Sequence, residues 1–275
     1  MTDFLSLYLP FALGLSVTGA VSGVMAGLLG IGGGIIMVPA MVLAFQLLGY
    51  NPDVLMHVAV GTSLAVIIPT GLRSARSHDR RGAVDHSILK LWGPWIVGAS
   101  LIGGLMAGLY TSAALQIIFG VMALFIALNM ALPVQRKFME SMAGVPMVNR
   151  ISAVVIGYVS ALMGIGGGSL TVPTLTALGN PIHTAVGTSS ALGVLLAVPA
   201  MIGFVISGWN AVGTPPLSLG FINIPSLVLI GGLATLTAPL GVTLAHKLDA
   251  KLLKIVFAIF LIVVGGRMIV QAFAG

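Results

Sequence analysis

The sequence predicts an all-α, polytopic membrane protein made of two inverted-topology repeats of about five helical segments each, with glycine-broken or re-entrant helices. Three observations support this fold class. Hydrophobic residues make up 58% of the 275-residue chain and charged residues only 7%, whereas soluble domains carry about 25% charged residues. A glycine-rich motif occurs twice within apolar sequence, and the basic residues gather between apolar segments. Lipid is therefore expected to be the main solvent of this chain.

The apolar sequence divides into a series of segments. They cover residues 9–29, 35–48, 55–72, 88–108, 114–132, 150–163, 169–178, 184–207, 221–246 and 253–272. A membrane-spanning helix needs about 20 apolar residues, so segments 35–48, 150–163 and 169–178 are too short. Half-helices and re-entrant hairpins remain alternatives for them. We divide the chain into a first membrane repeat (1–132), a cytoplasmic linker (133–149) and a second membrane repeat (150–275).

The basic residues predict the orientation in the membrane. Three clusters hold most of them: Arg73, Arg76, Arg80, Arg81 and Lys90; Arg136, Lys137 and Arg150; and Lys247, Lys251 and Lys254. Basic loops between spans are typical of the cytoplasmic side. We expect a multi-pass protein of the cell inner (plasma) membrane, with its N-terminus outside. No soluble scaffold presents these charges, so the expected partners are the lipid bilayer and a small anion, not nucleic acid. A homodimer is an open alternative to a monomer.

The glycine-rich motif marks a helix break in each repeat. Gly30-Ile31-Gly32-Gly33-Gly34 recurs as Gly164-Ile165-Gly166-Gly167-Gly168, an offset of 134 (168 − 34), and Pro39 and Pro173 follow at the same distance. Consecutive glycines unwind a helix. Unwound backbone persists in a bilayer only where protein or a polar cavity satisfies it. The freed N–H groups of helices restarting near Ile35 and Ser169 favour an anion. The candidate residues are therefore Gly32, Gly33, Gly34, Gly166, Gly167 and Gly168; close helix packing is the alternative explanation of these glycines.

Hydroxyl side chains accompany both breaks. Each repeat contains a Gly-Thr-Ser motif, which supplies Thr62, Ser63, Thr188 and Ser189. These hydroxyls either donate to substrate oxygens or bond back to their own helix carbonyls. At the offset of 134, Ile35 and Met37 of the first repeat become Ser169 and Thr171 in the second. We therefore expect the second break to contribute more ligand contacts.

Other chemistry has little support in the sequence. The acidic residues map to loops or span ends, whereas cation carriers usually keep a carboxylate within the membrane. His57 and His183 either cap helices at the interface or relay protons. The sequence has no cysteine and no metal-binding His-x-x-x-His spacing, and no Gly-Lys-Ser/Thr of a nucleotide-binding loop. We expect no enzyme activity, no catalytic residues, no metal and no cofactor.

These motifs together resemble those of the sulfite exporter TauE/SafE family. The resemblance rests on both Gly-x-Gly-Gly-Gly-x-x-x-Val-Pro motifs, ending at Pro39 and Pro173, and on both Ala-Val-Gly-Thr-Ser motifs. His78-x-x-x-Gly82-Ala83-Val84-Asp85 is similar to that family's first loop, although His86 replaces an aromatic residue that often follows. The resemblance implies a permease for small sulfur-containing anions such as sulfite or organosulfonates, usually moving outward.

The expected function is therefore a secondary transporter, an exporter that alternates access around an anion site near the membrane midplane. Two alternatives remain at this point. One is a passive anion channel of the same architecture. The other is a membrane assembly or scaffold protein that transports nothing and uses its glycines for packing alone.

Overall fold

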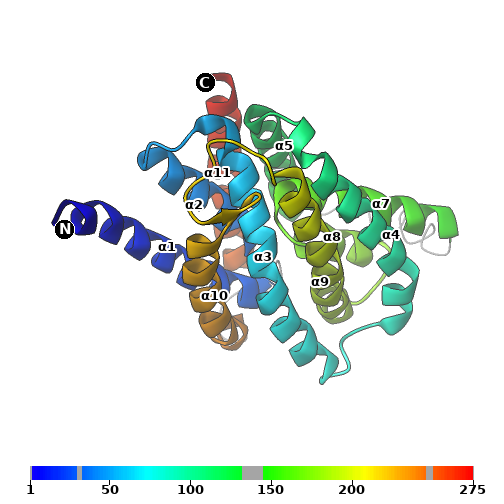
Figure 1. Ribbon diagram of the computed structural model, residues 1–275. Coiled ribbons are helices and arrows are strands. Elements are labelled where there is room, and N and C mark those ends of the chain that lie inside the picture. Colours follow the sequence, from blue (N-terminus) through cyan, green and yellow to red (C-terminus); the bar gives the residue numbers. More distant parts are fainter. Residues whose placement is uncertain (1, 30–32, 132–144, 246–249, 275) are drawn as a thin grey trace.

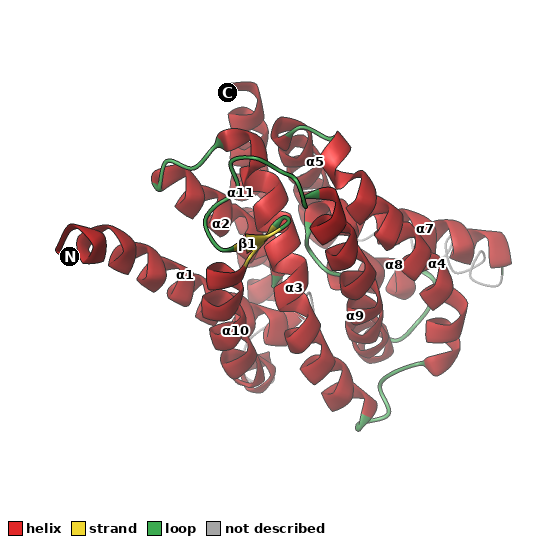
Figure 2. Cartoon of the chain, in the orientation of Figure 1, coloured by secondary structure: helices red, strands yellow, loops and turns green. Residues whose placement is uncertain are grey.

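The computed structural model describes residues 2–29, 33–131, 145–245 and 250–274, and over these residues it is almost entirely helical (Figures 1 and 2). The all-α, polytopic class expected from the sequence is thereby confirmed. The helices are α1 (Thr2–Leu29), α2 (Gly34–Leu47), α3 (Pro52–Asp79), α4 (His86–Met106), α5 (Ser112–Ala131), α7 (Pro146–Met163), α8 (Gly168–Ala177), α9 (Ile182–Ser207), α10 (Ile224–Ala245) and α11 (Ala250–Ala274). A 3₁₀ turn, η1 (Ala107–Leu109), and an antiparallel hairpin of β1 (Ser218–Leu219) and β2 (Ile222–Asn223) complete the described elements.

The segment predicted as a linker (133–149) falls mostly outside the described residues, as do the side chains of Arg136, Lys137, Lys247, Lys251 and Lys254. Where the description resumes, α7 begins at Pro146, before the boundary predicted at residue 150. Proline is well suited to the first turn of a helix, because its missing N–H would have no partner there.

Six helices within the described residues are long and apolar enough to cross a membrane: the α3, α4–η1, α5, α7, α9 and α10 segments. Helices α2 and α8 contain only 14 and 10 residues. At 1.5 Å per residue they extend about 21 and 15 Å, less than the roughly 30 Å of a hydrocarbon core. Neither helix can therefore cross a bilayer alone, and each is a half-helix that begins at a glycine break.

Helix α3 lies at the centre of the bundle, where Figure 1 shows it running between α10 and α9. Its most apolar window is 83% buried, whereas that of α10 is only 28% buried. Asn51 begins α3, accepting a hydrogen bond from the Asp53 backbone N–H at 3.1 Å, and Pro52 occupies the first turn. Both features are strong helix-start signals.

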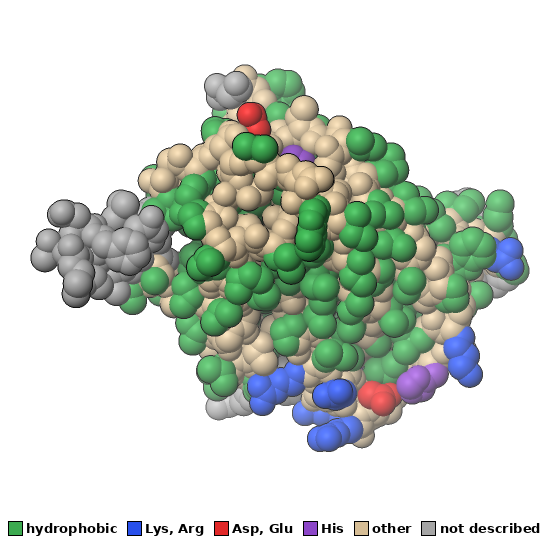
Figure 3. All heavy atoms as spheres, viewed as in Figure 1, with side chains coloured by type: hydrophobic (Ala, Val, Ile, Leu, Met, Phe, Trp, Pro, Cys, Tyr) green, Lys and Arg blue, Asp and Glu red, His purple; other side chains and the backbone are tan. Residues whose placement is uncertain are grey.

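The helices pack in corresponding pairs. Helix α1 lies against α10 and α7 against α4; α2 lies against α3 and α8 against α9; α5 packs on α11, and α3 on α9. If each helix of the first set (α1–α5) is exchanged for its counterpart in the second set (α7–α11), the same list of packed pairs results. Figure 3 shows hydrophobic side chains around the middle of the visible face and blue Lys and Arg side chains at the end where α3 finishes.

Candidate functional site

The second glycine break lies between α7 and α8. Gly164 ends α7 with a φ of 66°, and Gly166 has a φ of 72°. These left-handed conformations are strained for any residue with a Cβ, so the two glycines let the chain turn from one helix into the next. Helix α8 then begins at Gly168, and the first N–H groups of a helix have no partner within it.

The first break meets the second. A Cβ on Gly34 would clash with the carbonyl oxygen of Gly164 and lie 2.9 Å from the Cα of Ile165. The Ser63 hydroxyl donates a hydrogen bond of 2.7 Å to the same Gly164 oxygen. The start of α2 is therefore covered by protein, and a serine from α3 satisfies a carbonyl that the break leaves free.

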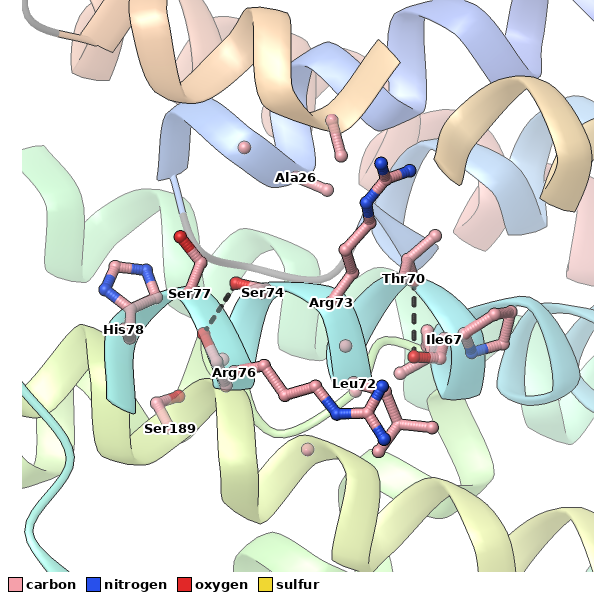
Figure 4. Close-up of a pocket in the computed structure, with 18 of the residues that line it drawn as sticks. Ala26, Ile67, Thr70, Leu72, Arg73, Ser74, Arg76, Ser77, His78 and Ser189 are labelled. Atoms are coloured by element: carbon pink, nitrogen blue, oxygen red, sulfur yellow. Dashed lines mark hydrogen bonds between the residues drawn. The ribbon is translucent and has the colours of Figure 1, made fainter. Parts of the chain in front are cut away.

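A cavity of about 930 Å³, which we call the basic cavity, opens beside the second break. Its deep wall contains Gly166, Gly167, Gly168 and Ser189, and the C-terminal half of α3 forms a long side, with parts of α1, α9 and α10 opposite. Figure 4 shows α3 crossing the cavity, with Ser189 on α9 facing it. Close packing of Gly167 on Gly193 holds the break against α9, since a Cβ on Gly167 would lie 3.2 Å from the Gly193 nitrogen.

Four arginines of α3 and the turn that follows it line the same cavity. They are Arg73, Arg76, Arg80 and Arg81. Arg73 donates a hydrogen bond of 3.1 Å from Nη1 to the carbonyl oxygen of Thr235 on α10. The cavity thus combines a helix start, which favours negative charge, with a strongly positive wall.

Ser189 has the properties of a ligand group within this cavity. Its side chain is completely buried, and its hydroxyl has no hydrogen-bond partner. Buried hydroxyls are nearly always hydrogen-bonded, and one left without a partner calls for an explanation. A ligand oxygen placed at the start of α8 would supply that partner.

The threonines of the two Gly-Thr-Ser motifs have structural partners. The Thr62 hydroxyl accepts a hydrogen bond of 2.9 Å from the Asn223 backbone N–H, and Thr188 accepts one of 2.9 Å from the Asp85 backbone N–H. We call these contacts the Thr62 clasp and the Thr188 clasp. Asn223 and Asp85 in turn cap α10 and α4 through their side-chain oxygens. Each clasp therefore fixes a helix start of one half of the chain to a long helix of the other half.

The end of α3 opposite the arginines is filled with aromatic side chains. Phe221 of the hairpin stacks on His57 with ring centroids 4.8 Å apart, and its edge packs on Phe204 at 6.4 Å. His57 is buried, and its Nε2 lies 3.0 Å from the Tyr110 carbonyl oxygen. The arginines thus border the cavity near the C-terminal end of α3, and the packed rings lie near its N-terminal end.

The site residues predicted from the sequence thus lie in different parts of the structure. Gly166, Gly167, Gly168 and Ser189 line the cavity; Gly33 precedes α2 with a φ of 71°. Gly34 and Ser63 lie where the breaks meet, and Thr62 and Thr188 form the clasps. Ser169 and Thr171 are buried in α8 without hydrogen-bond partners and do not border the cavity. Gly32 lies outside the described residues.

The arginines were not among the candidate site residues predicted from the sequence. Basic residues between spans are typical of the cytoplasmic side, and they were interpreted only as a sign of orientation. Their spacing carried the missing information. Arg76 and Arg80 are separated by four positions, which places them on one face of a helix. That face continues from the apolar segment into the cavity.

Fold and site together define a class: a polytopic, all-α membrane protein with a basic cavity that ends at a glycine-broken helix. The sequence profile of the sulfite exporter TauE/SafE family matches residues 15–268. The chain belongs to this family.

Curated relatives agree with this class. A Haemophilus influenzae protein described as a probable membrane transporter is 35% identical over 93% of this chain and 97% of its own length. Probable membrane transporters of Bacillus subtilis and Methanocaldococcus jannaschii are 30% and 26% identical, over 94% and 91% of this chain and 97% and 92% of their own lengths. No solved structure matches the chain significantly. These relatives support a membrane transporter.

Proposed function

We propose that this protein is a secondary exporter of small sulfur-containing anions, such as sulfite or an organosulfonate. The observation that carries the proposal is the basic cavity, whose deep wall joins the start of α8 to the unpartnered hydroxyl of Ser189. Backbone N–H groups and the positive end of the helix dipole favour an oxyanion at such a place. The choice of a sulfur oxyanion rests on the family's name, because the relatives are described only as transporters.

The orientation follows from the charges. The arginine-lined end of the molecule is assigned to the cytoplasm of a cell whose inner membrane holds the protein, because basic loops favour that side. The N-terminus then lies outside. The cavity is thus accessible to cytoplasmic anions, and an inside-negative potential favours their outward movement by about 2.3 kcal/mol per charge per 100 mV.

Alternating access is supported by the correspondence between the two halves. The packed helix pairs exchange with one another, and the Thr62 and Thr188 clasps are counterparts that join opposite halves. Inverted repeats with these properties alternate access by moving one repeat against the other around a fixed site. We assign the present arrangement to the state that is open to the cytoplasm and closed outside by Phe221.

Flux through reconstituted liposomes tests the proposal. The purified protein is incorporated into vesicles loaded with ³⁵S-sulfite or an organosulfonate, with a carboxylate of similar size for comparison, under imposed pH and voltage gradients. A carrier gives saturable flux that is stimulated by substrate on the opposite side. Flux that does not saturate would identify a channel instead. A folded protein that moves none of these anions would leave the glycines with a packing role and end the transport proposal.

The contribution of Ser189 is tested by Ser189→Ala in the same vesicles. Loss of one hydrogen bond to a charged group weakens binding about ten- to hundredfold, and KM should rise accordingly. Thr174→Ala is the matched control, because the Thr174 hydroxyl bonds to the Leu170 carbonyl oxygen within α8 at 2.7 Å and does not border the cavity.

A further inference from the structure

The arginines of the basic cavity form a charged face for which the described residues supply little compensation. Arg76 and Arg80 are four positions apart on α3 and its C-terminal cap, so both residues lie on one side of the helix. Like charges at this spacing repel one another and destabilise a helix. A bound anion would remove the repulsion.

Neighbouring groups do not neutralise this face. Arg73 is held by the Thr235 carbonyl oxygen. The carboxylate of Asp79 pairs with His86 Nε2 at 3.0 Å, and the carboxylate of Asp85 caps α4. Within the described part of the chain, Arg76 and Arg80 make no hydrogen bond or ion pair with any side chain. Both residues are exposed, and both line the cavity.

The glycine break packs on α3 before the arginines in the chain. Gly166 packs on Ile67, since a Cβ on this glycine would lie 3.3 Å from Ile67 Cδ1. Arg76 and Arg80 follow Ile67 by 9 and 13 residues (76 − 67 and 80 − 67), which is about 14 and 20 Å along a helix. A small oxyanion beside Gly166 therefore does not reach Arg80, whose backbone lies about 20 Å farther along α3.

Figure 4 shows how the arginines divide the cavity. Arg73 extends toward α1, which carries Ala26, whereas Arg76 extends to the other side of α3, and Ser77 and His78 follow them toward the end of the helix. Arg76 and Arg80 are free to turn toward an anion, because neither is tied to another helix. Guanidinium groups are suited to this task, since their donors match a tetrahedral or planar oxyanion.

We propose that Arg76 and Arg80 form a second oxyanion site at the mouth of the basic cavity, distinct from the site at Gly166–Gly168. This mouth site takes an oxyanion from the cytoplasmic solution and raises its concentration next to the deeper site. A cleft of one charge sign between low-dielectric walls concentrates counter-ions in this way. The proposal rests on the proposed function and adds a first stop on the transport path.

Binding of ³⁵S-sulfite to the detergent-purified protein, measured by anaerobic equilibrium dialysis, tests the mouth site without requiring flux. Wild-type protein should bind at two sites. The double variant Arg76→Gln/Arg80→Gln should keep only the deeper one, and Ser189→Ala should keep the mouth site. Lys90→Gln is the control for the loss of a positive charge outside the cavity, because Lys90 at the start of α4 does not line it; this variant should retain both sites.

The salt dependence identifies which site is lost. Charges open to solution are screened over about 8 Å at physiological ionic strength, so added salt should weaken the binding that needs Arg76 and Arg80 more than the remaining binding. Two sites that survive in the double variant overturn the proposal, as does equal loss of binding in Lys90→Gln. If wild type binds sulfite only through Arg76 and Arg80, the mouth site stands and the proposed deep site fails.

Flux measurements separate a substrate site from a lipid site, because a phospholipid phosphate has the same chemistry as the transported oxyanion. In purely zwitterionic vesicles the double variant should raise KM about tenfold and leave kcat within twofold, as expected for removed capture of substrate. Arg76→Lys/Arg80→Lys should restore most of the KM, which shows that the variants fold and that charge matters. A defect confined to vesicles containing anionic lipid would assign the arginines to a headgroup and overturn the proposal.

Discussion

The Thr62 hydroxyl accepts a hydrogen bond from the backbone N–H of Asn223, 2.9 Å away and 161 residues later in the chain. Its counterpart joins Thr188 to the backbone N–H of Asp85. The same geometry thus appears twice, with the halves of the chain exchanged. In both places a threonine side chain, rather than a neighbouring strand or helix turn, satisfies a backbone donor at the start of a helix.

Removing either threonine hydroxyl should destabilise the protein to a different extent. Thr62→Val leaves the buried Asn223 N–H without a partner, which costs about 1–3 kcal/mol in the free energy of unfolding. Thr188→Val should cost less, because Asp85 is only partly buried and water can replace the hydroxyl. Chemical denaturation in detergent measures both values. Equal losses would show that the two clasps do not differ in exposure as described.

The glycines that precede these threonines allow the clasps to form. A Cβ on Gly61 would lie 2.5 Å from the Phe221 carbonyl oxygen, and one on Gly187 would clash with the carbonyl oxygen of Ala83. Alanine at either position should therefore push the opposite loop away and destabilise the protein by about 1–3 kcal/mol. Gly98→Ala is the control. A Cβ there meets nothing within 4 Å, and its thermal midpoint should stay or rise, because alanine favours a helix.

Ser63 and Ser189 occupy matching positions and should respond oppositely to alanine. Ser63→Ala removes the donor to the Gly164 carbonyl oxygen and should lower stability by about 1–3 kcal/mol. Ser189→Ala removes a buried hydroxyl that has no partner, so stability should stay or rise while anion binding falls. Thermal unfolding and anion binding, measured on the same samples, check the pair. A marked loss of stability in Ser189→Ala would contradict the ligand role.

The N-cap of α4 gives a pH-dependent prediction. A hydrogen bond from the Ser87 side chain, followed by bonds from the Ile88 and Ser87 backbone N–H groups, holds the pKa of Asp85 below its ordinary value of 3.8. The ionised cap is thus present in full above that value and is lost as pH falls through the lower pKa of the folded state. At pH 7, Asp85→Ala should cost about 0.5–2 kcal/mol, and this difference should shrink in acid below the folded pKa. Denaturation of wild type and variant at both pH values measures it, and a pH-independent difference would refute the role of ionisation.

The sequence located the breaks well, and the reason is local. Helices were expected to restart near Ile35 and Ser169, and they begin at Gly34 and Gly168. Consecutive glycines act on the backbone where they stand, so no distant contact is needed to infer their effect.

The hydrogen-bond partners of the motif residues could not be predicted from the local sequence. Ser63 bonds to a carbonyl 101 residues away, and Thr188 to an N–H 103 residues away. These contacts depend on how helices from the two halves pack, which local periodicity does not specify. The same packing decides that Gly166, Gly167 and Gly168 border a cavity, whereas Gly34 is covered by Ser63 and Gly164. The four hydroxyl side chains of α8 also differ in their partners. Thr174 and Thr176 bond back to their own helix, whereas Ser169 and Thr171 have no hydrogen-bond partner.

The arginines of α3 affect both membrane insertion of the chain and the properties of the cavity. Positive charge beside a span decides which way the nascent chain enters the bilayer, and the same guanidinium groups border the cavity. A substitution that neutralises several of them therefore acts on insertion as well as on the mature protein. Replacement by lysine preserves the positive charge that directs insertion and removes the planar hydrogen-bonding fork, so this exchange tests ligand contacts while the insertion signal is kept.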